Sequence, residues 1–284
     1  MRKPRPSGRA ERSGKNVFRG AARTMAAPKS DPRPICVVTE GGPHIWAIVN
    51  TIADRLGPVS VILETPESKK QLLLGRARRQ GWISAIGQLG TMVLTRLGKR
   101  FFSSHSIRLI AEQKLEVEPR PGQTIIHVPS ANAPESLQAI ADIQPGVVLL
   151  AGCRLLSRQT LAKMPCPVLN YHAGIAPKYR GMNGGYWALA SGDAGNFGTT
   201  VHLVDAGVDT GGVLRQARGK PETGDTISSY ALRQAAFSRD ICVEAVGDAL
   251  AGKLATVDPR LPSKQWYHPT IWFYLWTGVK SGVW

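Results

Sequence analysis

The chain has 284 residues, of which 43% are hydrophobic and 20% are charged, a balance typical of a globular protein and not of a disordered or fibrous one. No stretch reaches the roughly 18 to 20 apolar residues that span a bilayer, which argues against a transmembrane protein. The formal net charge is +16, but residues 1–33 and 69–120 carry all of it, with surpluses of eight each. Because the rest of the chain is neutral, the net charge does not indicate a nucleic-acid-binding protein as a whole.

Residues 1–33 are rich in Arg, Pro, Gly and Ser and have no hydrophobic period, which predicts a disordered basic tail. The tail lacks the apolar core of a secretory signal. Cys36, Cys153, Cys166 and Cys242 show no CxxC or His-rich spacing, so neither a metal site nor a disulfide framework is indicated. We therefore predict a cytoplasmic protein with reduced thiols and no bound metal.

The next stretch, ICVVTEGGPHIWAIVN at 35–50, predicts a strand, a Gly-Gly-Pro turn and a helix. Short apolar runs predict further strands at 59–64, 124–128, 146–152 and 167–172, and a helix is predicted at 135–143. Apolar strands that alternate with helices are typical of an α/β fold, a Rossmann-like and mostly parallel sheet with helices on both faces. Ligands of such sheets bind beyond the carboxyl ends of the strands.

Between the early strands lies an insertion at 66–120, which is basic and predicted to be helical. Within it Trp82, Ile86, Leu89, Val93 and Leu97 share one helical face. The favoured interpretation is a helix whose apolar face packs on the core. A lid or acceptor-binding surface, and peripheral attachment to a membrane surface, are the alternatives.

The last third of the chain predicts strands at 197–204 and 213–219 around a glycine-rich loop at 205–212. A helix follows from Ser228 to about Leu250, and the chain closes with many aromatic residues. We predict one domain over 34–255 and an aromatic C-terminal extension over 256–284.

Polar side chains gather at the end of one predicted strand, in NYHAGIAPKYRG at 170–181. Asn170 and His172 stand two apart on an extended chain, so they face the same side. Asp205 and Asp209, in the glycine-rich loop, are candidates for a third group. A histidine accepts a proton near neutral pH, an amide donates to an oxyanion, and a carboxylate fixes the histidine and stabilises its cation. No Ser or Cys nucleophile is indicated, so direct attack of a bound nucleophile on a carbonyl fits better.

NYHAGIAPKYRGMNGGYWAL, followed by GDAGNFGTTVHLVDAGVDTGG, resembles the folate-dependent formyltransferases. The family pattern combines N-x-H, a P-x-Y/W-R-G loop, a G-T-[TS]-V-H strand and a D-x-G-G or D-T-G loop. All four occur here in order, and weaker similarity extends over 34–255. The resemblance implies the formyltransferase fold and an enzyme whose donor is 10-formyltetrahydrofolate.

The resemblance also implies a role for each matching position. Asn170 would hydrogen-bond the formyl oxygen, His172 would help to deprotonate the attacking amine, and Asp209 would act with His172 and an ordered water. The implied folate-binding residues are Arg154, Leu156, Asp205 and Val208. The implied acceptor-binding residues are Lys178, Tyr179, Arg180 and Gly181, which would otherwise only brace their loop. Thr200 and His202 are predicted to support the site, and a core role for His202 is equally compatible.

The acceptor is expected to be a small amine such as an amino-sugar nucleotide or glycinamide ribonucleotide. Pro43 removes a backbone donor from the turn where the glycinamide-ribonucleotide enzymes bind phosphate, which weakens that choice. A tRNA acceptor ranks lower, because only about thirty residues follow Leu250 and the methionyl-tRNA enzymes carry a further basic domain there. A non-catalytic folate-binding protein is the remaining alternative. The sequence indicates no oligomeric state.

Overall fold

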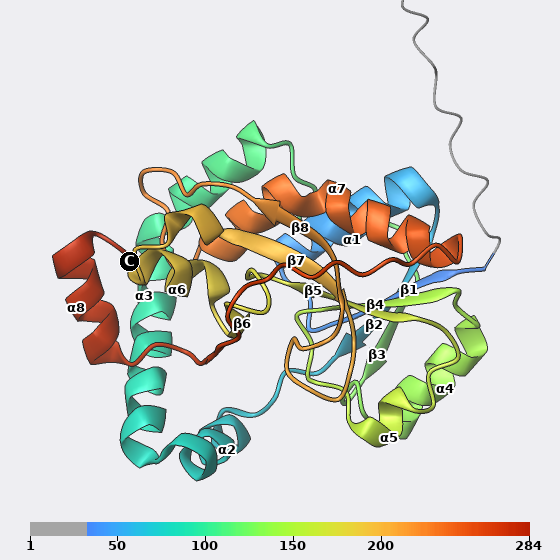
Figure 1. Ribbon diagram of the computed structural model, residues 1–284, viewed down its shortest axis with the longest axis horizontal. Coiled ribbons are helices and arrows are strands. Elements are labelled where there is room, and N and C mark those ends of the chain that lie inside the picture. The colour runs from blue at the N-terminus through green and yellow to red at the C-terminus, as the bar shows by residue number, and fades with distance from the viewer. Residues whose placement is uncertain (1–32) are drawn as a thin grey trace, which may run out of the picture.

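The computed structural model describes residues 33–284, except for the side chains of residues 98–103 (Figure 1). The predicted tail at 1–33 therefore lies outside the described residues, apart from Arg33. Seven strands form one sheet in the order β3-β2-β1-β4-β5-β7-β8. Their bounds are β1 Ile35–Thr39, β2 Val59–Glu64, β3 Ile125–Val128, β4 Val147–Ala151, β5 Val168–His172, β7 Gly198–Leu203 and β8 Val213–Arg218.

The five strands β3, β2, β1, β4 and β5 run parallel to one another, which confirms the predicted α/β fold class. This order is the Rossmann order. β7 and β8 complete the sheet in antiparallel orientation. Because β7 is antiparallel to β5, the carboxyl end of β7 lies next to the amino end of β5. The loop after β7 must therefore turn back to reach the carboxyl end of β5.

Helices cover both faces of the sheet (Figure 1). The helices α1 Pro43–Leu56 and α7 Tyr230–Leu250 pack on one face, where Ile48, Ile52 and Val246 join the largest buried cluster. α4 Pro134–Ile143 and the short α5 Arg158–Leu161 lie against the other face, where Ala139 and Ile140 enter a second cluster. β1 and β4 lie at the centre of the sheet with helices over both faces. Every residue of these two strands is therefore buried.

The segment 66–120 forms α2 Lys69–Gln80 and α3 Trp82–Glu112. The predicted packing of its apolar face is wrong: Trp82, Ile86, Val93 and Leu97 are all exposed. The buried side of α3 instead carries Ala85, Gln88 and Thr91. The first half of α3 packs against the C-terminal helix α8 Ile271–Ser281 and not against the sheet, and its last turns reach the core through Leu109.

The remaining elements are short and surround the end of β5. They are β6 Arg180–Gly181, α6 Gly184–Ala190, a 3₁₀ turn at Ala194–Asn196 and β9 Gln265–Trp266. β6 and β9 pair with each other, so the C-terminal extension is joined to the loop that follows His172. None of the described helices combines the length and hydropathy of a membrane-spanning segment.

Candidate active site

Asn170 and His172 of β5 come together with Asp209 of the 205–212 loop, whereas Asp205 bonds within that loop. Asn170 pairs with His202 in the β5–β7 register, and His172 pairs with Thr200. Residues that stand opposite each other on paired strands point to the same face of the sheet. The loop after β7 turns back over this face and brings Asp209 to it.

Asp209 is the centre of the cluster and is 9% exposed. Its Oδ1 accepts a hydrogen bond from Asn170 Nδ2 at 3.1 Å, and its Oδ2 accepts one from the Gly181 N–H at 2.7 Å. Oδ2 also lies 3.4 Å from His172 Nδ1, and Oδ1 lies 3.4 Å from His202 Nε2. Burial alone would raise the pKa of Asp209, but the neighbouring His172 ring and the Gly181 N–H outweigh it and hold the pKa below its usual range. The carboxylate is therefore ionised at neutral pH.

The backbone at Asp209 has a φ of 49°, in the left-handed region that few residues other than glycine adopt. Such backbone geometry costs energy and persists where neighbouring contacts hold it, which is common at functional sites. Here the hydrogen bonds to Asn170 and Gly181 supply those contacts.

His172 is held in one tautomer by its surroundings. Its Nε2 lies 2.6 Å from the carbonyl oxygen of Tyr179, which can only accept, so the proton of a neutral ring lies on Nε2. Nδ1 is then the basic nitrogen, and it faces the Asp209 carboxylate. A proton taken up at Nδ1 would lie between the ring and that carboxylate.

The same reasoning assigns the tautomer of His202. Its Nδ1 lies 2.6 Å from the Leu203 carbonyl oxygen and donates to it, so Nε2 of a neutral ring is an acceptor. Asn170 Nδ2 lies 3.0 Å from this Nε2. The two amide hydrogens of Asn170 are thus directed at His202 and at Asp209. Of the two interpretations of His202, this geometry favours a supporting role, and Thr200 lies beside it, bonded to the Gly174 carbonyl.

The loop after β5 supplies backbone groups to the cluster, and the side chains of this loop hold the loop in place. Tyr179 is 1% exposed, and its hydroxyl donates to Asp193. Lys178 Nζ lies 2.6 Å from the same carboxylate. Arg180 donates to the Val208 carbonyl at 2.7 Å, which ties this loop to the Asp209 loop. The predicted acceptor contact is wrong for the Tyr179 side chain, because the buried ring stacks on Trp266; for the other loop residues it stays a prediction.

Gly181 joins this loop to the C-terminal extension. Its φ is 92°, and a Cβ added to it would lie 2.2 Å from the Trp266 carbonyl oxygen. No other residue fits this position without moving the β6–β9 pair. The N–H that Gly181 donates to Asp209 therefore has its position set by a strand from residues 265–266.

The predicted folate-binding residues lie around the end of β4 and in the Asp209 loop. The Arg154 N–H donates to Glu64 Oε1 at 2.5 Å, so a pterin contact by the Arg154 backbone would fall to its carbonyl group. Leu156 is buried in the second core cluster. Asp205 is exposed and accepts from the Gly207 N–H and the Thr210 hydroxyl, which shapes the loop that contains Val208.

Sequence reasoning missed Glu64, which ends β2 at the carboxyl edge of the sheet. Its carboxylate is fully buried and accepts from the N–H groups of Ala131 and Arg154 at 2.7 and 2.5 Å. It thus holds two of the loops that border the site. Burial, with the Glu64 charge second, raises the pKa of the neighbouring Glu40. The available signal was an acid directly after a buried apolar run, in VSVILE.

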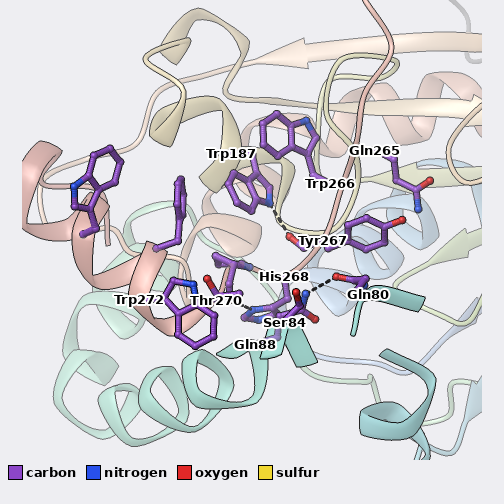
Figure 2. A pocket seen from close by; sticks show the side chains of 13 residues that line it. Gln80, Ser84, Gln88, Trp187, Gln265, Trp266, Tyr267, His268, Thr270 and Trp272 are labelled. Carbon is purple, nitrogen blue, oxygen red and sulfur yellow. Dashed lines mark hydrogen bonds between the residues drawn. The ribbon is translucent and has the colours of Figure 1, made fainter. Parts of the chain in front are cut away.

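The described residues also enclose two hollows, and neither is lined by Asn170, His172 or Asp209. One, of about 600 Å³, lies between the start of α1, the middle of α3 and the start of α7, and its wall includes His44, His105 and Asn183. The Asn183 Nδ2 group is buried and has no hydrogen-bond partner among the described residues. The other, of about 720 Å³, is walled by Trp187, Trp266 and Trp272 (Figure 2). His268 lines both.

Comparison with known proteins gives consistent results. The family model described as formyl transferase matches residues 98–246, more than half of the chain. The methionyl-tRNA formyltransferase of Koribacter versatilis is 33% identical over 127 residues, which are 44% of this chain and 40% of that protein. The chain thus spans less than half the length of this curated relative.

Solved structures share the fold. A glycinamide ribonucleotide transformylase from Symbiobacterium toebii superimposes with a TM-score of 0.53 at 24% identity, covering 80% of this chain and 92% of that one. A sugar N-formyltransferase from a Shewanella species gives a TM-score of 0.53 at 13% identity, covering 82% and 76%. At these identities the likeness supports the sheet topology.

Proposed function

Because the chain belongs to the formyl transferase family, we propose that it moves a formyl group from 10-formyltetrahydrofolate to the primary amine of a small acceptor. The observation that carries this proposal is that the Asn170 amide and the His172 imidazole both lie within hydrogen-bond or ion-pair distance of the Asp209 carboxylate. The three groups supply an oxyanion donor, a base and a counter-charge.

The proposed reaction forms a bond between the acceptor nitrogen and the formyl carbon and breaks the bond from that carbon to N10. Nδ1 of His172 takes a proton from the attacking amine, and Asp209 stabilises the resulting imidazolium. As the formyl oxygen gains negative charge, Asn170 exchanges one of its two hydrogen bonds for a bond to that oxygen. The proton ends on N10, so the products are the formamide and tetrahydrofolate.

The residues at the end of β4 fit a flat, hydrogen-bonding donor such as a pterin. The Arg154 Nε group is buried and has no hydrogen-bond partner among the described residues. Leu156, two positions along the chain, is apolar and buried, and Asp209 of the neighbouring loop bonds to Asn170 near the end of β5. Buried polar groups are normally satisfied, so an unpaired N–H in such a place supports a ligand there.

The hollow at the start of α1 is the proposed acceptor site. Pro43 is the first residue of α1 and has no N–H, and the N–H groups of Ile45 and Trp46 both bond to the Gly42 carbonyl. Few donors therefore remain for a phosphate at this helix end. This argues for an amino-sugar or another small amine more strongly than for glycinamide ribonucleotide. The unpaired Asn183 amide in the wall suits a hydroxyl or carbonyl of such an acceptor.

A second candidate is methionyl-tRNA, because the Koribacter relative carries that name and α2 and α3 are rich in Lys and Arg. The two candidates predict different products in one experiment. The purified chain is incubated with the folate donor and, in separate reactions, with amino-sugar nucleotides, glycinamide ribonucleotide and charged methionyl-tRNA. Each product is then identified by the mass of one added formyl group.

Formylation of a small amine, lost in Asn170→Ala, is the expected result. Formylation of methionyl-tRNA alone would replace the small acceptor by the second candidate. Tight binding of the folate without transfer to any amine would indicate the non-catalytic alternative and contradict the proposal.

A further inference from the structure

The proposed chemistry leaves unexplained a broad apolar surface on two adjoining helices. Between residues 82 and 97, α3 exposes six large apolar residues, and at 100° per residue they fall within one third of the helix circumference. They are Trp82, Ile83, Ile86, Val93, Leu94 and Leu97. Monomeric globular proteins rarely expose such contiguous stripes, so this side of α3 is expected to meet a partner.

The helix α8 extends the stripe. Its outward side carries Trp272, Leu275, Trp276 and Val279, and all four are exposed. The two helices lie side by side on one flank of the molecule (Figure 1). Gly87 and Gly90 let α8 approach closely, since a Cβ on either would meet Trp272 or Ile271. The exposed sides of α3 and α8 therefore form one surface, which we call the α3–α8 face.

The wall between the helices is shown in Figure 2, where Trp272 lies beside Ser84 and Gln88. Trp82 stands at the start of α3, and Trp272 and Trp276 stand on α8. Tryptophan side chains prefer the boundary between hydrocarbon and water, where the ring is in an apolar medium and the N–H remains hydrated.

The segments of the chain that carry the face are basic. Residues 69–112 contain nine Lys or Arg and one acid, Glu112, and residues 259–284 contain three Lys or Arg and no acid, which gives twelve cations against one anion. Arg78, Arg79, Arg96 and Arg108 are exposed and have no ion pair with any described carboxylate. Lys280 lies over the Trp276 ring, with its Nζ 4.5 Å from the ring centre.

From these observations we propose that the α3–α8 face docks on an anionic lipid bilayer, with both helices lying in the plane of the surface. Apolar side chains would enter the acyl boundary while the flanking cations meet lipid phosphates. A second copy of the chain would bring two basic rims together, which disfavours self-association. A nucleic acid has no complement for the aliphatic residues at the centre of the face. The proposal does not depend on the formyl-transfer activity.

The test is co-sedimentation of the full chain with vesicles of phosphatidylcholine, alone or mixed with an equal part of phosphatidylglycerol. Ile83 and Val279 are the most exposed members of each stripe, at 78% and 83%, so Ile83→Ser with Val279→Ser leaves the fold intact. We expect this double variant to lower partitioning onto the mixed vesicles by about tenfold or more. The control is Val257→Ser, an exposed apolar residue (55%) outside α3 and α8, and this variant should bind like the unchanged chain.

A second variant, Arg78→Glu with Arg79→Glu, tests the contribution of the basic residues to vesicle binding. This variant should lose about tenfold or more in binding to the mixed vesicles, and high salt should produce the same loss in the unchanged chain. Equal binding of the Ile83 and Val279 double variant and the unchanged chain would overturn the proposal, since the basic residues at 1–33 would then suffice. Concentration-dependent dimerisation that the double variant abolishes, without vesicle binding, would assign the face to a second copy. Retention on RNA that survives the double substitution would assign the cations to a nucleic acid.

Discussion

At the scale of single residues, the cluster is organised by what each nitrogen already contacts. The Tyr179 carbonyl occupies one side of the His172 ring, and the Leu203 carbonyl occupies one side of the His202 ring. Each ring therefore presents its basic nitrogen to the Asp209 region, but only His202 receives the Asn170 amide there. His172 is left as the ring that can take a proton from a substrate, and His202 as the ring that orients Asn170.

Replacing Asn170 with alanine removes the proposed donor to the formyl oxygen. We expect kcat to fall by about 10²- to 10³-fold, the loss that follows removal of one oxyanion donor. Steady-state kinetics with the acceptor found in the screen measure this effect. Thermal unfolding should remain close to that of the unchanged chain, and a near-normal kcat in the folded variant would exclude the proposed role of Asn170.

The substitution Asp209→Asn keeps the shape of the side chain and removes its charge. The His172 imidazolium then lacks its counter-charge, so we expect kcat to fall by about 10²- to 10³-fold and the acid limb of the pH–rate profile to move to lower pH. Compared at saturating folate, where a change in folate binding does not alter kcat, Asp205→Asn is the matched control, because this carboxylate bonds only within its own loop. Equal losses in both variants would mean that loop structure, and not the charge at Asp209, limits the rate.

At the scale of elements, the second half of the molecule is assembled from pieces far apart in the chain. α3 is held by α8 about 180 positions later, with the Thr91 hydroxyl donating to the Pro269 carbonyl at 2.9 Å. In the same region β9 pairs with β6. These long-range contacts fix the insertion and the C-terminal extension against each other.

A glycine substitution tests the contact between these helices. A Cβ on Gly87 would lie 2.3 Å from the Trp272 ring, so Gly87→Ala should push α8 away and lower the free energy of unfolding by about 1 to 3 kcal/mol. Gly75→Ala, in the middle of α2, meets nothing closer than 3.5 Å and should be neutral or stabilising by up to about 1 kcal/mol. Urea unfolding of both variants measures the difference. A Gly87→Ala protein as stable as the Gly75→Ala protein would contradict this packing.

Local patterns were sufficient to predict the seven strands of the main sheet and the pair on β5, but not the short strands β6 and β9. Each central strand is a short apolar run bounded by turn residues, and Asn170 and His172 share a face because extended chains alternate. The buried side of α3 was not predictable, because its partner α8 is distant in sequence and approaches over glycines instead of apolar side chains. The residues alone left Asp205 and Asp209 as equal candidates for the third group, and the resemblance favoured Asp209; the turn back from β7 that brings Asp209 to β5 is a tertiary feature.

At the scale of the whole molecule, the two hollows meet at His268, which joins the aromatic wall of one to the acceptor side of the other. Burial is the main cause that lowers the pKa of His268 to about 4, and the Arg76 charge acts in the same direction. Because the folded protein holds this ring neutral, protonation of His268 favours the unfolded chain, and acid lowers the free energy of unfolding of the whole molecule.

Stability should therefore fall as the pH drops from about 6.5, where an unfolded histidine titrates, toward 4. In this window the unfolded chain binds a proton at His268 that the folded chain does not. His268→Gln removes this difference, so between pH 7 and pH 5 the variant should gain about 1 to 2 kcal/mol relative to the unchanged chain. His127→Gln, at an exposed position of β3, is the control and should gain nothing. Urea unfolding at both pH values measures the gain, and equal pH dependence in all three proteins would contradict it.

The pairing of Gly181 with Trp266 also affects where this chain can be truncated or joined to another protein. The family match ends at residue 246, yet the loop that donates to Asp209 is aligned by a strand nearly twenty positions beyond it. A truncated chain that stops at residue 246 would keep every proposed catalytic side chain. It would lose β9, the strand that positions Gly181 and its hydrogen bond to Asp209. Chimeras built from this chain should therefore carry its last segment along with the catalytic half.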